Sequence, residues 1–308
     1  MTLAALNPQL LHDVAPLAAQ FGTAKPFRHV QIEQFFTQAV AAQLLAQFPP
    51  FDTKRARNEA GEVGGKASVE RIRALGPSFL ALDDLLRSPE LLELVGRITG
   101  IPDLLYDPYY FGGGTHENLH GQDLDPHIDF NRHPIEPWHR RLNLLVYLNE
   151  GWQSAWGGNL ELHSDPRSPD NHIRTVIPSF NRALIFETTE TSWHGFSKIL
   201  LPDAERARSR KSIAVYFYSA TRPPEELAAT HSTIYVDRPL PEHLQAGHIL
   251  TAQDVETLQL LIARRDQHGQ RLYRDLTRLT AELEQCQALF KMSRLRRLAH
   301  MAKRFLDR

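Results

Sequence analysis

The sequence contains a single cysteine, Cys286, among 308 residues. One cysteine cannot form an intramolecular disulfide, and its scarcity also excludes a zinc site built from several cysteines. Low cysteine content is typical of proteins from reducing compartments, so we expect a cytoplasmic location. The first 21 residues lack the basic start of a secretory signal peptide, and Asn7, His12 and Asp13 interrupt their apolar residues.

Long apolar runs and an excess of charge are also missing. No stretch approaches the roughly 20 apolar residues of a membrane-spanning helix, so we expect no membrane span. The formal net charge is -1, so no overall field draws the chain to nucleic acid, and no nucleic-acid partner is expected. Gly65 and Lys66 suggest a phosphate-binding loop, but Ala60 and Ala67 occupy positions where that motif needs glycine and a hydroxyl residue.

The composition is that of a folded protein, with 42% apolar and 23% charged residues. Residues 1–103 combine helical spacing of apolar residues with a short strand, and we expect them to form a support region. Asp52–Ser68 is polar and glycine-rich, which predicts a loop. The expected elements are a helix over Leu3–Phe21, a strand over Pro26–Ile32, a helix over Phe35–Phe48 and a helix over Leu80–Ile98.

From Leu104 onward, short strand-like segments alternate with turns. Such a series predicts a double-stranded β-helix, the jelly-roll or cupin-like architecture, with helices packed outside. The expected fold class is therefore mainly β with flanking helices, and residues 104–222 are the expected jelly-roll catalytic core. The expected strands are Leu105–Phe111, Asp125–Phe130, Leu142–Leu148, Asn159–His163, Ile173–Ile177, Ala183–Glu187, Trp193–Ile199 and Ser212–Ser219.

Residues 223–308 are expected to form a C-terminal α-helical segment. Apolar residues from Leu272 to Phe290 follow a 4-3-4-3-4 spacing, which is typical of a coiled-coil seam. Such a seam can pair two copies as a homodimer or pack on the jelly roll, and both alternatives stay open. A third interpretation is that the basic tail beyond Ser293 binds an anionic partner, although no aromatic residues interleave with its charges to stack on bases.

Within the strand-rich region, His127 and Asp129 stand two residues apart. In an extended strand such residues project from the same face, so an imidazole and a carboxylate can enter one cavity. A second histidine would complete a 2-His-1-carboxylate site for Fe(II), and His194 is the best candidate. The chain has 15 histidines, and a His-x-Asp pair alone is more often a surface contact or a buried hydrogen bond than a metal site.

Arg210 stands at the start of a strand that continues to Tyr218. A guanidinium can bind a carboxylate through two hydrogen bonds, and Ser212 shares its strand face. The order His-x-Asp, distal His, Arg-x-Ser resembles the Fe(II)/2-oxoglutarate-dependent oxygenases, specifically their prolyl-4-hydroxylase-like branch. The resemblance extends over residues 104–219 and includes the Gly157-Gly158 turn.

The resemblance implies a 2-oxoglutarate-dependent dioxygenase with His127, Asp129 and His194 as Fe(II) ligands. Such an enzyme uses O2 to hydroxylate an unactivated C–H bond of a peptidyl or small-molecule substrate, with release of succinate and CO2. A carboxylate at position 129 favours hydroxylation, since halogenating relatives carry a small residue there. The alternative is a non-catalytic or 2-oxoglutarate-independent cupin-like protein that binds a metal or another ligand.

The resemblance also implies a binding site for 2-oxoglutarate. Arg210 falls where the family pairs an arginine with the distal carboxylate, and strand alternation favours it over Arg208 and Lys211. Asn143 shares the parity of Tyr147, so it either faces the cosubstrate or is an outward-facing polar residue. The expected cosubstrate contacts are Arg210, Tyr147, Ser212 and Asn143.

The sequence is silent on the substrate. The polar loop from Asn131 to His139 is a candidate for the substrate site, with a solvated loop as the alternative. Trp152 and Trp156 are expected to pack under the jelly roll. Tyr109 and Tyr110 either line the site or pack in the core.

Overall fold

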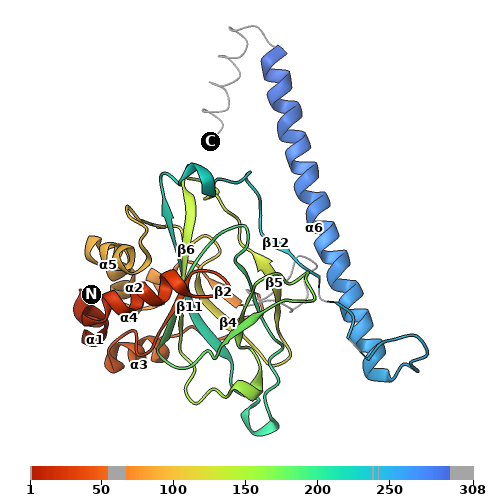
Figure 1. Ribbon diagram of the computed structural model, residues 1–308, viewed down its shortest axis with the longest axis horizontal. Coiled ribbons are helices and arrows are strands. Elements are labelled where there is room, and N and C mark those ends of the chain that lie inside the picture. The colour runs from red at the N-terminus through yellow and green to blue at the C-terminus, as the bar shows by residue number, and fades with distance from the viewer. Residues whose placement is uncertain (1, 55–66, 238, 242, 292–308) are drawn as a thin grey trace. The chain divides into compact units, whose positions relative to one another are not determined.

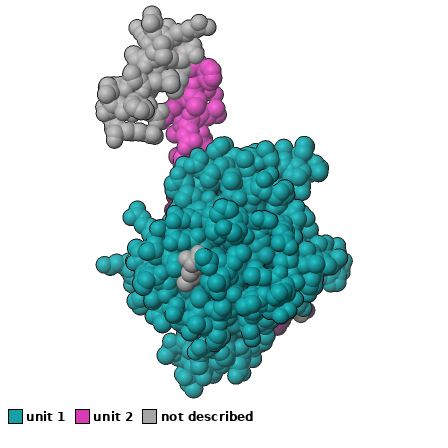
Figure 2. All heavy atoms as spheres, turned by 90° about the vertical axis from the view of Figure 1, so that its left-hand side faces the viewer, with its two compact units in different colours: residues 1–238 teal, residues 239–308 magenta. Residues whose placement is uncertain are grey.

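The computed structural model describes residues 2–54, 67–237, 239–241 and 243–291. It divides the chain into two compact units, residues 1–238 and 239–308, coloured teal and magenta in Figure 2. The first unit contains the jelly roll and its supporting helices. The described part of the second contains the long helix α6 (Ala252–Lys291). The division falls after residue 238 because the segment that follows residue 222 still contributes a strand to the jelly roll.

Short helices precede the jelly roll and gather on one side of it (Figure 1). The single helix expected over Leu3–Phe21 is wrong, because Asn7 accepts a hydrogen bond from the backbone of Gln9 and starts a new helix. The helix expected over Leu80–Ile98 is likewise two helices. The elements are η1 (Leu3–Ala5), α1 (Pro8–His12), α2 (Val14–Thr23), α3 (Gln38–Ala46), η2 (Ile72–Leu75), α4 (Pro77–Leu86) and α5 (Pro89–Thr99).

The break between α4 and α5 has a local cause. Ser88 accepts a hydrogen bond from the backbone N–H of Leu91. Pro89 takes the first helical position, where a backbone N–H has no partner within the helix, so the missing N–H of proline costs nothing there. Gly100 ends α5 in the left-handed conformation. Each helix can therefore turn its apolar face toward the same core.

The larger sheet is antiparallel and has the order β1-β9-β6-β11-β4-β2, with β3 also paired to β11. One face packs against the helices through buried residues such as Leu144, Ile185 and Val215. The other face, which includes Asn143 and Tyr147, points toward the second sheet. Its strands are β1 (His29–Ile32), β2 (Ala67–Val69), β3 (Leu105–Tyr106), β4 (Gly114–Asn118), β6 (His139–Tyr147), β9 (Arg182–Glu187) and β11 (Arg210–Ser219).

The smaller sheet has the order β12-β5-β10-β7-β8 and is also antiparallel. Two such sheets face to face form the double-stranded β-helix, so the expected fold class, with its C-terminal helix, is confirmed. Trp152 and Trp156 pack below the jelly roll with Phe196 and Ile199, as expected. The strands are β5 (Leu124–Ile128), β7 (Leu160–His163), β8 (Ile173–Val176), β10 (Trp193–Phe196) and β12 (Ile234–Tyr235).

Three local expectations need correction. The strand expected over Leu105–Phe111 is limited to β3, because the chain turns through a left-handed Tyr110. The strand β4 follows at Gly114, where only a turn was expected; a Cβ there would lie 2.0 Å from the Val69 carbonyl oxygen. The loop expected over Asp52–Ser68 gives way to β2 at Ala67, and its residues 55–66 lie outside the described residues.

Candidate active site

His127, Asp129 and His194 converge between the two sheets. His127 lies on β5, Asp129 directly follows that strand, and His194 on β10 is the register partner of His127. Asp129 Oδ1 is 3.8 Å from His127 Nε2, and Asp129 Oδ2 is 3.5 Å from His194 Nε2. All three residues offer ligand atoms within 4.8 Å of one another, which is the spacing that one metal ion requires.

Each histidine is oriented by its own backbone. His127 Nδ1 lies 2.9 Å from the carbonyl oxygen of Asp125, and His194 Nδ1 lies 2.9 Å from that of Ser192. A carbonyl oxygen only accepts, so each Nδ1 carries the proton and each Nε2 presents a lone pair to the centre. Burial also lowers the pKa of His194, which keeps this imidazole neutral.

Asp129 is held by two neighbours that stand on β6. Asn143 donates a hydrogen bond to Oδ2 at 2.7 Å, and Arg140 Nη2 lies 3.1 Å from the same oxygen. Burial alone raises the pKa of Asp129, but the charge of Arg140 and the Asn143 hydrogen bond counteract it, so the pKa lies below its usual range. The carboxylate is therefore ionised. Asn143 faces inward and is not an outward polar residue, and its contact with the cosubstrate stays a prediction.

Arg140 is a site residue that sequence reasoning missed. Strand parity places Arg141, not Arg140, on the face of Asn143, but a bulge shifts the register here: Leu142 pairs with Phe217 and Arg140 with Tyr218. Arg140 therefore enters the site, where its guanidinium lies 3.5 Å from the ring centroid of Tyr216. The indication in the sequence was the Arg-Arg pair at the start of a buried strand.

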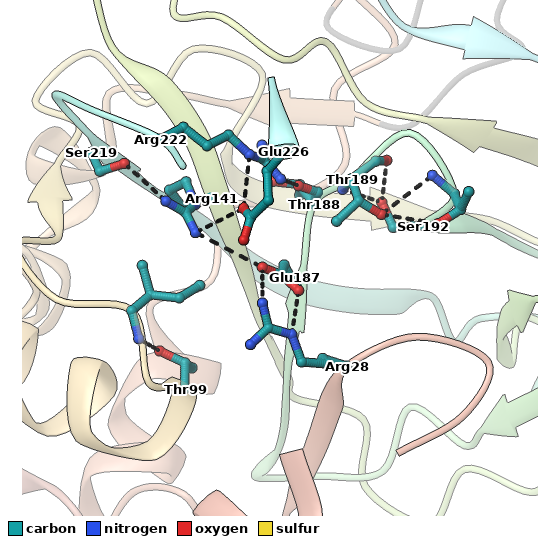
Figure 3. Close-up of polar contacts among 12 residues, drawn as sticks. Arg28, Thr99, Arg141, Glu187, Thr188, Thr189, Ser192, Ser219, Arg222 and Glu226 are labelled. Carbon is teal, nitrogen blue, oxygen red and sulfur yellow. Dashed lines mark hydrogen bonds and ion pairs between the residues drawn. The ribbon is translucent and has the colours of Figure 1, made fainter. Parts of the chain in front are cut away.

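The bulge sends Arg141 into a different charge network (Figure 3). Arg141 contacts Glu226 at 3.2 Å and Glu187 at 3.9 Å, and Arg28 binds Glu187 through two nitrogens. Arg222 completes the network by binding Glu226. This network ties β1, β6 and β9 to the segment after β11, so Arg141 stabilises the jelly roll without contacting Asp129.

Arg210 is buried and lines the same cavity as His127, Asp129 and His194. Its Nε donates a hydrogen bond to the Gly158 carbonyl oxygen at 2.7 Å, and its guanidinium lies against the rings of Phe196 and Tyr147. Burial lowers its pKa, and none of these contacts supplies a negative charge. The Tyr147 hydroxyl is buried and has no hydrogen-bond partner among the described residues. A buried cation beside an unpartnered phenol fits an incoming carboxylate.

The other two candidate cations lie elsewhere. Arg208 is exposed and binds Glu205 and the Glu150 carbonyl oxygen. Lys211 binds Glu117 at 3.1 Å and also contacts Ser209. Neither residue lines the cavity that contains the three converging residues.

One cavity contains both the three converging residues and most of the residues expected to bind the cosubstrate. Arg210, Ser212 and Asn143 line it together with His127, Asp129 and His194. Two residues that sequence reasoning missed, His116 and Asn118, line it from β4, where they pair with Ser212 and Arg210. The remaining lining residues are Leu124, Leu145, Leu160, Phe196 and Tyr216.

A segment after β11 returns to cover the metal-site strand. Tyr235 on β12 is the register partner of His127, and their ring centroids are 5.1 Å apart. His231 and Ala229 hydrogen-bond to Asn131, two residues beyond Asp129. This strand was not expected, because its two residues give too short a pattern to detect.

The tyrosines before the glycine turn have separate roles. Tyr110 is buried and hydrogen-bonds to Asp83, so it belongs to the core. Tyr109 is exposed and contacts Glu136. Neither lines the cavity.

The ligand atoms of His127, Asp129 and His194 are of the types that bind Fe(II). Two neutral imidazoles and one carboxylate form the facial arrangement that non-haem Fe(II) sites use. The orphaned Tyr147 hydroxyl and the uncompensated Arg210 fit one end of a dicarboxylate such as 2-oxoglutarate.

Residues 114–218 match the model of the 2OG-Fe(II) oxygenase superfamily. This match begins with β4, ends in β11 and contains all of the converging residues described above. The match covers 105 of the 308 residues, and it agrees with the superfamily that the motif order predicted. The superfamily requires Fe(II), 2-oxoglutarate and O2.

Among characterised proteins, the chain is similar to the prolyl 3-hydroxylase OGFOD1 of Mus musculus, with 30% identity over 145 residues, covering 42% of this chain and 24% of that protein. It is also similar to OGFOD1 of Xenopus laevis, with 29% identity over 92 residues, covering 29% and 17%. The similarity thus spans a quarter or less of these relatives. A prolyl 4-hydroxylase structure from Phytophthora capsici has a TM-score of 0.49 at 20% identity, covering 84% of this chain and 75% of that one.

Proposed function

We propose that the protein is an Fe(II)- and 2-oxoglutarate-dependent dioxygenase that hydroxylates an unactivated C–H bond. The observation that carries this proposal is the convergence of His127, Asp129 and His194 in the cavity that also contains Arg210. A metal site alone would fit many functions. A metal site next to a buried, uncompensated cation fits a metal that binds together with an anionic cosubstrate.

Each residue has a defined task in this proposal. When bound, Fe(II) supplies the oxidative chemistry in which 2-oxoglutarate and O2 become succinate and CO2 while the substrate is hydroxylated. His127, Asp129 and His194 hold the metal. Arg210 pairs with the distal carboxylate of 2-oxoglutarate, and the contacts that assist it are Tyr147, Ser212 and Asn143.

The protein controls the surroundings of this chemistry. Leu145, Leu160 and Phe196 line the cavity with apolar surface, which excludes water from the reacting groups. Asn143 also holds Asp129 in place, so it belongs to both the metal set and the cosubstrate side. A carboxylate at position 129 occupies a metal position, which favours hydroxylation.

The substrate class that we propose is a prolyl residue in a polypeptide. The similarity to two prolyl 3-hydroxylases supports this class. Aromatic surface beside the metal set also supports it: Phe130 follows Asp129, and the half-exposed Phe111 packs edge-to-face on it with ring centroids 5.7 Å apart. Flat aromatic faces provide apolar contact area for a pyrrolidine ring.

The first test is spectroscopic. Under anaerobic conditions, Fe(II) and 2-oxoglutarate together should give a weak visible charge-transfer band, and Asp129→Ala should weaken or abolish it. Asp165→Ala, which removes an exposed carboxylate, is the matched control and should leave the band unchanged. Absence of the band, with no metal retained on the purified protein, would favour the binding-protein alternative.

The second test identifies the substrate. Succinate release should be measured over pools of prolyl peptides, free amino acids and sugars. A peptide pool that stimulates succinate release above the uncoupled background supports the prolyl substrate. Stimulation by another pool retains the dioxygenase and replaces the substrate class.

We further propose that α6 forms a homodimer. Leu272, Leu276, Leu279 and Leu283 are 55–65% exposed, so the second unit does not cover this row itself. A second copy of the same row is a partner of matching length and heptad phase. No helix in the described ranges is long and apolar enough to cross a membrane.

A further inference from the structure

We propose that His243, His248 and Asp254 form a second metal site, which takes a borderline divalent cation such as Zn²⁺. The three side chains offer ligand atoms within 4.8 Å of one another, in the second unit of the chain. None of them belongs to the proposed iron set or to the superfamily match. The site is therefore independent of the proposed function.

The ligand atoms already converge on one carboxylate. His243 Nε2 lies 2.7 Å from Asp254 Oδ1, and His248 Nε2 lies 3.0 Å from Asp254 Oδ2. The two imidazole rings stand edge-to-face with centroids 5.3 Å apart. Both rings thus turn the same nitrogen, Nε2, toward one carboxylate, each facing a different oxygen, and two imidazole ligands of one ion converge in the same way.

The carboxylate is fixed before any ion arrives. Thr251 donates two hydrogen bonds to Asp254 Oδ2, from its backbone N–H at 2.8 Å and its hydroxyl at 2.7 Å. This leaves Oδ1 facing His243 as the better metal ligand. Asp254 lies in the first turn of the 40-residue α6 and is buried, so its position is set by the helix.

The histidines are carried by a closed loop. Backbone hydrogen bonds run from Leu244 N–H to Pro241 O and from His248 N–H to Gln245 O, and Gly247 adopts a left-handed conformation. The four residues between the two histidines therefore form a turn that returns the second imidazole to the first. His243 is largely exposed, so an ion can enter from solvent and keep water as its fourth ligand.

The donor types select the class of ion. Two imidazole nitrogens and one carboxylate oxygen suit Zn²⁺, Cu²⁺ or Ni²⁺, whereas Ca²⁺ and Mg²⁺ require mainly oxygen ligands. A bound ion would connect the loop to the start of α6. Its effect is therefore structural, and it would stabilise the N-terminal end of the helix.

The test uses the full chain with His127→Ala, Asp129→Ala and His194→Ala, so that the proposed iron site does not bind the probe. Isothermal titration with Zn²⁺ alone should show one saturable site. Adding His243→Gln and His248→Gln should abolish it, while His268→Gln, which removes a histidine from α6 away from the proposed site, should not. Far-UV circular dichroism checks that the helix remains in every variant.

A second, spectroscopic measurement checks the binding that the calorimetric titration reports. Co²⁺ bound to the same background protein should give visible d–d absorption, which the paired glutamine variant lacks. Absence of a saturable site, or equal binding by the paired glutamine variant and the background protein, would overturn the proposal. The three side chains would then form only a hydrogen-bonded cluster at the start of α6.

Discussion

The guanidinium of Arg140 forms a buried ion pair with Asp129, with Nη2 3.1 Å from Oδ2, behind the proposed iron site. The same arginine also binds the Asn143 side-chain oxygen, and Asn143 donates to Asp129. These three residues form a closed triangle. Arg140 thus fixes the proposed iron ligand both directly and through Asn143, so we assign it a positioning role.

Arg140→Met should weaken Fe(II) binding by roughly 10- to 100-fold, the usual effect of losing an outer partner of a metal ligand. Arg141→Met is the matched control, because it removes a buried charge from the opposite side of the same strand. The control should lower the free energy of unfolding and leave the iron affinity unchanged. Titration of the charge-transfer band measures the affinity, and equal losses in both variants would contradict the positioning role.

Arg210→Ala should raise the half-saturating 2-oxoglutarate concentration strongly, whereas Arg208→Ala should not, because Arg208 is exposed and outside the cavity. Tyr147→Phe removes one hydrogen bond to a charged group, so we expect roughly a tenfold increase. Succinate release as a function of 2-oxoglutarate concentration gives these values. A larger effect from Arg208→Ala than from Arg210→Ala would show that Arg208, and not Arg210, binds the 2-oxoglutarate carboxylate.

Gly158→Ala should impair 2-oxoglutarate binding through Arg210. A Cβ at Gly158, where φ is +65°, would lie 2.8 Å from Ile199 Cγ1 and 3.2 Å from Arg210 Cδ. The control is Gly121→Ala, which shares a positive φ but has nothing within 4 Å of its Cβ. Both variants should lose about 1–2 kcal/mol of stability from backbone strain, and only Gly158→Ala should raise the 2-oxoglutarate requirement.

His29 should make folding less favourable in acid. Burial lowers its pKa below the ordinary value of 6.5, so the unfolded chain takes up a proton more readily than the folded chain. The free energy of unfolding therefore falls as the pH drops through about 6.5 and below. Urea titrations at about pH 7 and 5 should show a smaller acid loss for His29→Gln than for the wild type. An equal loss in both proteins would contradict this account.

The proposed dimer can be tested through Cys286, which is exposed and lies on the seam. In a parallel, in-register coiled coil the two copies of this residue face each other, so mild oxidation should cross-link them. Leu276→Asp with Leu283→Asp should abolish both the cross-link and the dimeric mass in sedimentation. Dimeric mass without a cross-link indicates an antiparallel pair, and monomeric mass for the wild type contradicts dimerisation.

Local periodicity explains which features could be predicted from the sequence. His127 and Asp129 share a strand face because they are two residues apart, and the same rule placed Ser212 with Arg210. The rule fails at Arg140, because the bulge opposite Tyr218 places Arg140, and not Arg141, on the same strand face as Asn143.

Strands without an apolar pattern could not be predicted. The strand β4 is Gly-Thr-His-Glu-Asn, and it is buried because β2 and β11 flank it on both sides, which is a tertiary effect. His116 and Asn118 were missed for that reason. The short β12 was missed because its pairing with β5 depends on residues about 100 positions away.

The pairing of β12 with β5 also limits how a polypeptide can approach the proposed iron ligands. Ile234 pairs with Ile128, and the Val236 N–H donates to the Pro126 carbonyl oxygen, so the outer backbone edge of β5 already has its hydrogen-bond partners. A substrate peptide cannot dock there by strand addition unless the segment is displaced. The proposed prolyl substrate therefore has to reach the cavity without adding a strand to β5, and the edge strand that this sheet presents is β12.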